Sequence, residues 1–325
     1  MKNAPNTSPI RLAVVVPCYC EEQVLDETTF RLSKILDSLI ADGLITENSY
    51  ILYINDGSTD RTWEIISHLH DQNRYVCGVS LAANTGHQNA LIAGLSVAVN
   101  NSDAIITIDA DLQDDVNTIR DMVLKHVEGI DIVYGVRNKR DTDTWFKRTT
   151  ALGFYRLMKT MGIRSVYNHA DYRLMSKRAV NFLLQYHERN LFLRGLVPLI
   201  GYKTDCVYYE RSERFAGNSK YPLRKMLHFA VDGITSFSVK PLHLVLYAGL
   251  ALLTVAFVLL VRIIILSTIR TLPPQEFLML SLWFCTGCIM TGLGIIGVYI
   301  GRIYTEVKQR PRYNIETVLL KDRQP

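Results

Sequence analysis

The sequence lacks the signatures of several protein classes. Its six cysteines are scattered and form no paired CxxC array with zinc spacing, and it contains no internal repeat or low-complexity segment. The net charge is only +5, whereas a nucleic-acid-binding protein would carry a larger excess along a basic stripe. Residues 1–11 are polar, so we expect no cleavable signal peptide. These absences argue against a zinc module and a nucleic-acid partner, and we expect six reduced cysteines in a cytoplasmic setting.

Apolar residues are abundant, at 48% of the chain, and are unevenly placed. Residues 242–266 contain Arg262 as their only charge, and residues 277–300 form a second uninterrupted apolar run. A helix over the first run would be about 37 Å long, enough to cross a hydrocarbon layer of roughly 30 Å. We therefore expect two transmembrane helices within 241–302, since a buried core helix seldom needs so long an uncharged stretch.

Basic residues flank these runs on one side. By the positive-inside rule, these basic residues place the soluble part and a C-terminal tail, residues 303–325, on the cytoplasmic side of the membrane. We therefore expect a protein of the inner (cytoplasmic) membrane. Between the soluble part, residues 1–221, and the first run lies a segment, residues 222–240, with apolar residues at helical spacing. We expect an amphipathic helix there, lying in the membrane interface or packing against the soluble part.

The soluble part alternates between two kinds of pattern. Short β-branched runs at 12–16, 50–55, 76–81, 104–108 and 130–134 are separated by helical patterns at 24–40, 60–70, 88–99 and 117–127. This βαβαβαβαβ order predicts an α/β fold with a mostly parallel, Rossmann-like sheet covered on both faces. Residues 203–209 alternate between apolar and polar, and we expect an antiparallel strand there.

The most informative stretch follows the fourth predicted strand. The apolar run ends in Asp109 and Asp111, which places two carboxylates at the carboxyl edge of the sheet, where open α/β sheets bind ligands. Oxygen ligands suit Mg²⁺ or Mn²⁺, and such an ion commonly shares itself with substrate phosphates, so we expect a nucleotide diphosphate as the ligand. The alternative is an aspartate-rich turn that caps the next helix.

Further motifs lie at the ends of the other predicted strands and beyond: 16–22 (VPCYCEE), 55–60 (NDGSTD), 84–91 (NTGHQNAL), 171–175 (DYRLM), 188–196 (ERNLFLRGL) and 214–221 (RFAGNSKY). Together with the aspartates, the set resembles the family-two inverting glycosyltransferases of the A-type fold. Within these it is most similar to the polyisoprenyl-phosphate glycosyltransferases, above all the bactoprenol glucosyltransferases of O-antigen and cell-wall modification; dolichol-phosphate mannose synthase is a more distant relative.

The resemblance implies roles for individual residues. Pro17, Tyr19, Glu21 and Asp56 would bind the nucleotide; Asp109, Asp111 and Gln113 would hold the metal and the diphosphate; Asp111 and Asp171 would be catalytic; Arg137, Arg214 and Lys220 would bind the acceptor phosphate. Asp171 could equally orient a sugar hydroxyl or pair with Arg173, and His87 is either a sugar-site residue or a helix-start histidine. The chain departs from the family at Cys20, where asparagine is usual, and at Asp115, where proline is common.

The implied reaction is inverting transfer of a hexose, with glucose from UDP-glucose favoured, onto undecaprenyl phosphate at the cytoplasmic membrane face. UDP-GlcNAc, UDP-galactose, an aminoarabinose derivative and GDP-mannose remain alternative donors. A processive polysaccharide synthase would need a Gln-x-x-Arg-Trp motif, which we do not find, and a nucleotide-sugar-binding membrane scaffold would have lost a metal aspartate.

The same reading implies partners. Two spans are too few to flip a glycolipid, so we expect a separate flippase and a downstream glycosyltransferase. Relatives suggest a homotetramer, and glycines in the second apolar run would permit close helix packing.

Overall fold

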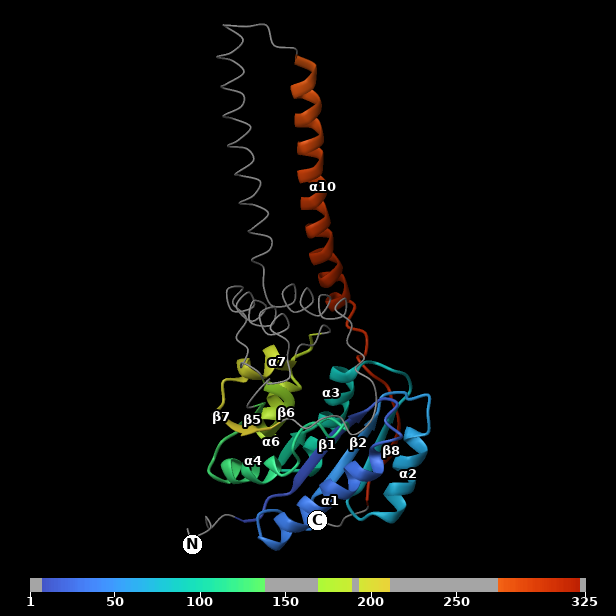
Figure 1. Cartoon of the computed structure of the whole chain (residues 1–325), viewed down its shortest axis with the longest axis vertical. Helices are drawn as coiled ribbons and strands as arrows, with labels where there is room; N and C mark the ends of the chain where they lie inside the picture. The colour runs from blue at the N-terminus through green and yellow to red at the C-terminus, as the bar shows by residue number, and fades with distance from the viewer. Residues whose placement is uncertain (1–7, 138–168, 189–192, 211–273, 322–325) are drawn as a thin grey trace. The chain divides into compact units, whose positions relative to one another are not determined.

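The computed structural model describes residues 8–137, 169–188, 193–210 and 274–321, and the chain divides into two compact units. The first unit comprises Met1–Arg156, Arg164–Pro222 and Arg310–Pro325. Its described elements, in chain order (Figure 1), are β1 (Leu12–Cys18), α1 (Leu25–Ala41), β2 (Tyr50–Asn55), α2 (Thr62–Gln72), β3 (Val76–Leu81), α3 (His87–Ala98), η1 (Val99–Asn101), β4 (Ala104–Thr107), α4 (Thr118–Val127), β5 (Ile132–Arg137), β6 (His169–Ser176), α6 (Lys177–Leu183), α7 (Leu193–Leu196), η2 (Val197–Ile200), β7 (Thr204–Tyr209) and β8 (Ile315–Leu319).

These strands form one sheet in the order β7-β5-β6-β4-β1-β2-β3-β8. The central strands β4, β1, β2 and β3 are mutually parallel, and β6 and β8 pair antiparallel with their neighbours. The predicted mostly parallel α/β sheet is thereby confirmed. Strands β1 to β3 are buried along their whole length, which explains their continuous apolar runs.

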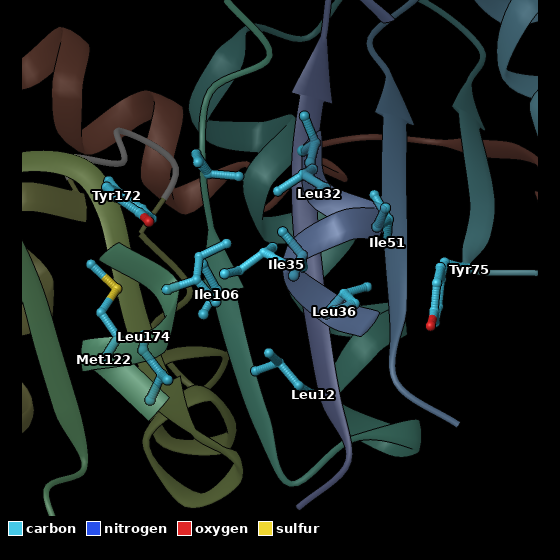
Figure 2. Close-up of a cluster of buried hydrophobic side chains, with 14 of the residues drawn as sticks. Leu12, Leu32, Ile35, Leu36, Ile51, Tyr75, Ile106, Met122, Tyr172 and Leu174 are labelled. Carbon is cyan, nitrogen blue, oxygen red and sulfur yellow. The ribbon is translucent and has the colours of Figure 1, made fainter. Parts of the chain in front are cut away.

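Successive side chains of each strand point to opposite faces, so each strand contributes to two cores. On one face, Leu12, Ile51 and Ile106 pack against Leu32 and Leu36 of α1 (Figure 2). Helices α2 and α4 add side chains to the same cluster, whereas α3 packs against β1 and β2 outside this cluster. Each fully buried leucine or isoleucine contributes about 1.5–3 kcal/mol, so the packing on the two faces stabilises the position of the strands.

The expectation of an antiparallel strand over 203–209 is wrong. Strand β7 pairs with β5 in parallel, with Ile132 opposite Thr204. The alternation reflects the partial exposure of a strand at the sheet edge, and edge exposure is independent of strand direction. On this side of the sheet the reversed strand is β6, inserted between β4 and β5.

The residues that we assigned to a C-terminal tail contribute to the sheet. Strand β8 pairs antiparallel with β3 at its edge. Just before β8, the Tyr313 hydroxyl donates to the Ser96 hydroxyl at 3.0 Å, and the backbone N–H of Ala82 donates to the carbonyl of Asn314 at 3.0 Å. The C-terminal segment thus contacts both α3 and the loop that follows β3.

The second unit comprises Leu157–Ile163 and Leu223–Gln309. Its described element is helix α10 (Pro274–Val307), which contains the whole second apolar run. Among the described helices, none meets the combined requirement of length and apolarity for a membrane span. The predicted amphipathic helix over 222–240 and the first predicted span lie outside the described residues.

Candidate active site

The loop after β4 carries three of the predicted donor-site residues. Strand β4 ends at Thr107, and Asp109, Asp111 and Gln113 follow at the carboxyl edge of the parallel strands. The backbone N–H of Gln113 donates to Oδ1 of Asp111 at 3.2 Å, so these two residues are held together. Gln113 is buried, whereas the side chain of Asp109 is 37% exposed and accessible to a ligand.

The same loop contains a strained residue. Leu112 lies between two predicted metal ligands with a φ of +56° in the left-handed region, which is unusual for a bulky side chain. The side chain of Leu112 is buried. Two residues earlier, the backbone carbonyl of Ala110 accepts a hydrogen bond of 2.9 Å from the Thr28 hydroxyl of α1. Such a conformation costs on the order of 1–3 kcal/mol and persists only where packing and hydrogen bonds impose it.

His87, the first residue of α3, lies between two acidic side chains. Its Nε2 atom is 3.6 Å from Oδ1 of Asp109 and 3.7 Å from Oδ2 of Asp171. Burial lowers the pKa of His87, but Asp171 and Asp109 outweigh that effect and raise the pKa to about 9. Without a metal, the imidazole is therefore a cation at neutral pH.

Asp171 on β6 is the most strongly paired carboxylate of the site. It accepts a hydrogen bond from Arg173 Nη2 at 2.5 Å and another from Arg194 Nη2 at 3.3 Å. Burial would raise the pKa of Asp171, but Arg194, His87 and Arg173 together hold it well below its usual range. A carboxylate in this state is a weak proton acceptor, and it is well suited to accept a hydrogen bond from a ligand.

Asp56, which follows β2, organises the loop after β3. Its buried carboxylate accepts hydrogen bonds from the N–H of Thr85 at 2.8 Å, the Thr85 hydroxyl at 3.0 Å and the N–H of Gly86 at 2.9 Å. Gly57 allows this approach, because a Cβ there would lie 2.5 Å from the backbone of Ala83, and its φ is +62°. The expected nucleotide contact of Asp56 stays a prediction.

The loop after β1 lies beside the start of α2. The N–H of Cys20 donates to the Ser58 hydroxyl at 3.0 Å, and the N–H of Glu21 donates to the Thr62 hydroxyl at 3.0 Å. Tyr19 is exposed, as a nucleotide-stacking side chain would be before its ligand binds. Pro17 lies within β1. The nucleotide roles of Pro17, Tyr19 and Glu21 stay predictions.

The carboxylates of the β4 loop fit a divalent cation. Burial, together with Asp114, Asp171 and Asp111, raises the pKa of Asp109 to about 6 despite the opposing effect of His87. A cation would relieve this repulsion. In the part of the chain that the structure describes, no group of three His, Cys, Asp or Glu side chains is placed to hold a metal alone. Mg²⁺ characteristically binds one or two carboxylates and completes its shell with phosphate oxygens and water, which is what this loop offers.

The three predicted acceptor-phosphate residues divide into two groups. Arg137, at the end of β5, pairs with the buried carboxylate of Asp114 at 3.0 Å. Arg214 and Lys220 lie outside the described residues. The acceptor roles of all three stay predictions.

Sequence reasoning missed two residues of the site and left a third open. The sequence indicates no role for Arg194 within its motif, and it predicts Tyr209, whose hydroxyl donates to Oδ1 of Asp114 in the β4 loop, only as part of a strand. For His87 the sequence leaves both a sugar-site role and a helix-start role open. The position of His87 between Asp109 and Asp171 depends on the insertion of β6 beside β4, and no local sequence signal indicates that pairing of strands.

Comparison with known proteins finds a glycosyltransferase family. The family model described as "Glycosyl transferase family 2" matches residues 13–184. An uncharacterized glycosyltransferase of Bacillus subtilis is 52% identical over 312 residues, covering 96% of this chain and 93% of that protein. A solved glucosyl-3-phosphoglycerate synthase of Mycobacterium tuberculosis aligns with a TM-score of 0.45 at 19% identity, covering 70% of this chain and 79% of that one.

Two further relatives carry more specific names. A prophage bactoprenol glucosyl transferase homolog of Escherichia coli is 38% identical over 317 residues, covering 95% of this chain and 99% of that protein. A bactoprenol glucosyl transferase of Shigella phage SfII is 37% identical over 310 residues, covering 94% of this chain and 98% of that protein.

Proposed function

The chain belongs to glycosyl transferase family 2, and we propose that it transfers a hexose from a nucleotide sugar to a polyprenyl phosphate with inversion at the anomeric carbon. The favoured donor is UDP-glucose, and the favoured acceptor is undecaprenyl phosphate at the cytoplasmic face of the inner membrane. Relatives named bactoprenol glucosyl transferase, which match nearly the whole chain, support this choice.

The observation that carries the proposal is the state of Asp171. Transfer to a sugar hydroxyl would require a general base at the acceptor, but Arg173 and Arg194 bind this carboxylate and depress its pKa. A lipid monophosphate needs no base, because its second pKa is about 6 and it is largely dianionic at neutral pH. The site therefore fits a phosphate acceptor better than a hydroxyl acceptor.

The remaining tasks of the protein are alignment and charge compensation. Asp171 can accept a hydrogen bond from a sugar hydroxyl and so fix the orientation of the anomeric carbon toward the incoming phosphate oxygen. Asp109, Asp111 and Gln113 would hold Mg²⁺ or Mn²⁺, which when bound stabilises the departing nucleoside diphosphate. Inversion then follows from a single direct displacement.

We propose that basic residues bind the phosphate of the acceptor and that the membrane holds its lipid chain. Arg137, Arg214 and Lys220 are the proposed contacts to the acceptor phosphate. The apolar runs within 241–302, the second of which forms α10, are the proposed membrane anchor. The product would require a separate flippase and an outer-surface glycosyltransferase, and we propose a homotetramer as the working assembly.

The test is lipid-linked sugar formation in membranes that contain the protein and labelled UDP-glucose. We expect Asp111→Ala to abolish the labelled lipid, because the substitution removes a carboxylate from the proposed diphosphate site. Asp205→Ala, which removes a carboxylate of β7 that pairs with Lys125 of α4, serves as a surface control. Undiminished turnover by Asp111→Ala would contradict the proposal.

The donor is tested by supplying UDP-glucose, UDP-GlcNAc, UDP-galactose, the aminoarabinose donor and GDP-mannose in parallel. Selective transfer of glucose is the expected result. Binding of a nucleotide sugar without any lipid-linked product would instead favour the non-catalytic scaffold.

A further inference from the structure

Two tyrosines from neighbouring parts of the sheet hold the end of the β4 loop. The hydroxyl of Tyr209, at the end of β7, donates to Oδ1 of Asp114 at 2.5 Å. The hydroxyl of Tyr172, in β6, donates to the backbone carbonyl of Asp115 at 3.0 Å. Their rings meet edge to face with centroids 5.5 Å apart, so the two hydroxyls belong to one packed unit. We call Tyr172 and Tyr209 the tyrosine pair.

Asp114 depends on these contacts because its carboxylate is buried, with 3% of the residue exposed. Tyr209 and Arg137 both donate to Oδ1, the latter at 3.0 Å. Among the described residues, Oδ2 of Asp114 is buried and has no hydrogen-bond partner. A buried carboxylate that is supported at one oxygen tolerates the loss of a donor poorly. Loss of the Tyr209 hydroxyl should therefore shift Asp114 and the loop that carries it.

The packing around the pair indicates that its position is tightly fixed. In β5, a Cβ at Gly135 would lie 2.9 Å from Cδ1 of Tyr172 and 3.1 Å from Cε of Met122. The strand can therefore pass the tyrosine ring only with a glycine at this position. Burial and the charge of Asp114 also raise the pKa of Tyr209, so its hydroxyl remains a donor.

We propose that Tyr209 is a positioning residue for the donor: through Asp114 it fixes the loop of Asp109, Asp111 and Gln113 in the geometry that binds a nucleoside diphosphate with its divalent cation. This inference rests on the proposed function, because it takes that loop to be the diphosphate end of the donor site. In this proposal Tyr209 acts through Asp114 and not by contact with the diphosphate or the cation.

The test compares Tyr209→Phe with a matched control elsewhere in the chain. Tyr75 donates to Oδ1 of Asp37 at 2.5 Å, and Arg74 donates to the same oxygen at 2.7 Å, so the control has the same three chemical groups as the Tyr209 arrangement. Tyr75 directly precedes β3 and its partner Asp37 lies in α1, so Tyr75→Phe removes a hydroxyl of the same kind without touching the β4 loop.

Calorimetry on the purified full chain gives the affinity for UDP in the presence and absence of Mn²⁺. We expect Tyr209→Phe to weaken Mn²⁺-dependent UDP binding roughly 10- to 100-fold, the usual effect of losing a group that orients metal ligands. Donor KM should rise while kcat at saturating donor changes much less. Tyr75→Phe should bind UDP as the unmodified chain does.

A double substitution tests whether Tyr209 acts through Asp114. If it does, Asp114→Asn with Tyr209→Phe should bind UDP no more weakly than Asp114→Asn alone. Additive losses, or unchanged UDP affinity in Tyr209→Phe, would overturn the inference while leaving the proposed function intact. Absence of Mn²⁺-dependent UDP binding in the unmodified chain would overturn both. Should Tyr209→Phe fail to fold, Asp114→Asn alone tests the same link, and an unchanged UDP affinity in that variant would overturn the inference.

Discussion

At the scale of single residues, His87 is the charge that balances the site before a metal binds. Its pKa is raised to about 9, above the ordinary value of about 6.5, because Asp171 and Asp109 outweigh the effect of burial. The stabilising effect of this charge is fully present below about pH 6.5 and is lost as the pH rises through about 9. In chelator-treated protein, the stability advantage over His87→Gln should therefore shrink across this interval.

Urea unfolding at a series of pH values measures this difference. His68→Gln, at an exposed position of α2, controls for the loss of an imidazole as such. A stability difference between the unmodified chain and His87→Gln that is constant from pH 6.5 to above 9 would show that His87 carries no such charge.

Cys20 occupies a backbone conformation that suits asparagine better. Its φ is +55°, in the left-handed region, where L-residues pay roughly 1–2 kcal/mol and asparagine pays less. We expect Cys20→Asn to raise the melting temperature and Cys20→Val to lower it, because a β-branched side chain is the least tolerated there. Equal melting temperatures for the two variants would show that the loop relaxes without strain.

The sequence identified some site residues and missed others for a physical reason. Asp109 and Asp111 follow an apolar run directly, so local pattern alone placed them at the sheet edge. The charge state of Asp171 depends on Arg194, 23 residues later, and on His87, 84 residues earlier. Tyr209 reaches Asp114 across 95 residues. Contacts of this range come from the order of strands in the sheet, and no local spacing specifies that order.

At the scale of elements, continuous apolar runs were enough to locate the buried strands. Strands β2 and β3 begin and end where the sequence predicted, because both faces of these strands are covered. The direction of β7 was predicted wrongly, since alternation indicates a partly exposed strand and carries no information on direction. Strand β8 was not expected, because five residues with alternating burial after a long apolar run give little signal.

The C-terminal strand leads to a prediction about stability and donor binding together. Shortening the chain after Gln309 removes β8 and the Asn314 carbonyl that holds the N–H of Ala82, next to the loop that Asp56 organises. Each lost hydrogen bond contributes about 1 kcal/mol, so we expect a drop of several kcal/mol in the free energy of unfolding. UDP affinity should fall with it, since the loop loses one of its supports.

The matched control is a chain shortened after Lys321, which retains β8 and all of these contacts. Its melting temperature and UDP affinity should equal those of the full chain. If the chain shortened after Gln309 unfolds at the same temperature as this control, β8 contributes nothing to the sheet.

At the scale of the whole molecule, the proposed reaction joins a water-soluble donor to an acceptor in a lipid bilayer. The first unit contains the carboxylates proposed to bind the donor and its cation, whereas the second contains the long apolar helix α10. The proposal therefore requires that α10 lie in the membrane while the β1 loop, with Cys20, faces the cytoplasm. The chain's own cysteines can report on both conditions.

Cys285 of α10 is exposed in the isolated chain, so a surrounding bilayer would protect its thiol from a charged, membrane-impermeant maleimide. In inverted inner-membrane vesicles, we expect the reagent to label a chain that retains Cys20 alone and to spare a chain that retains Cys285 alone until detergent is added. In intact cells, neither should react. Labelling of Cys285 without detergent would place α10 in water, and labelling of Cys20 from outside the cell would reverse the proposed orientation. The first result would separate the protein from its acceptor in the membrane, and the second would separate the donor site from the cytoplasmic nucleotide sugars that the proposed reaction needs.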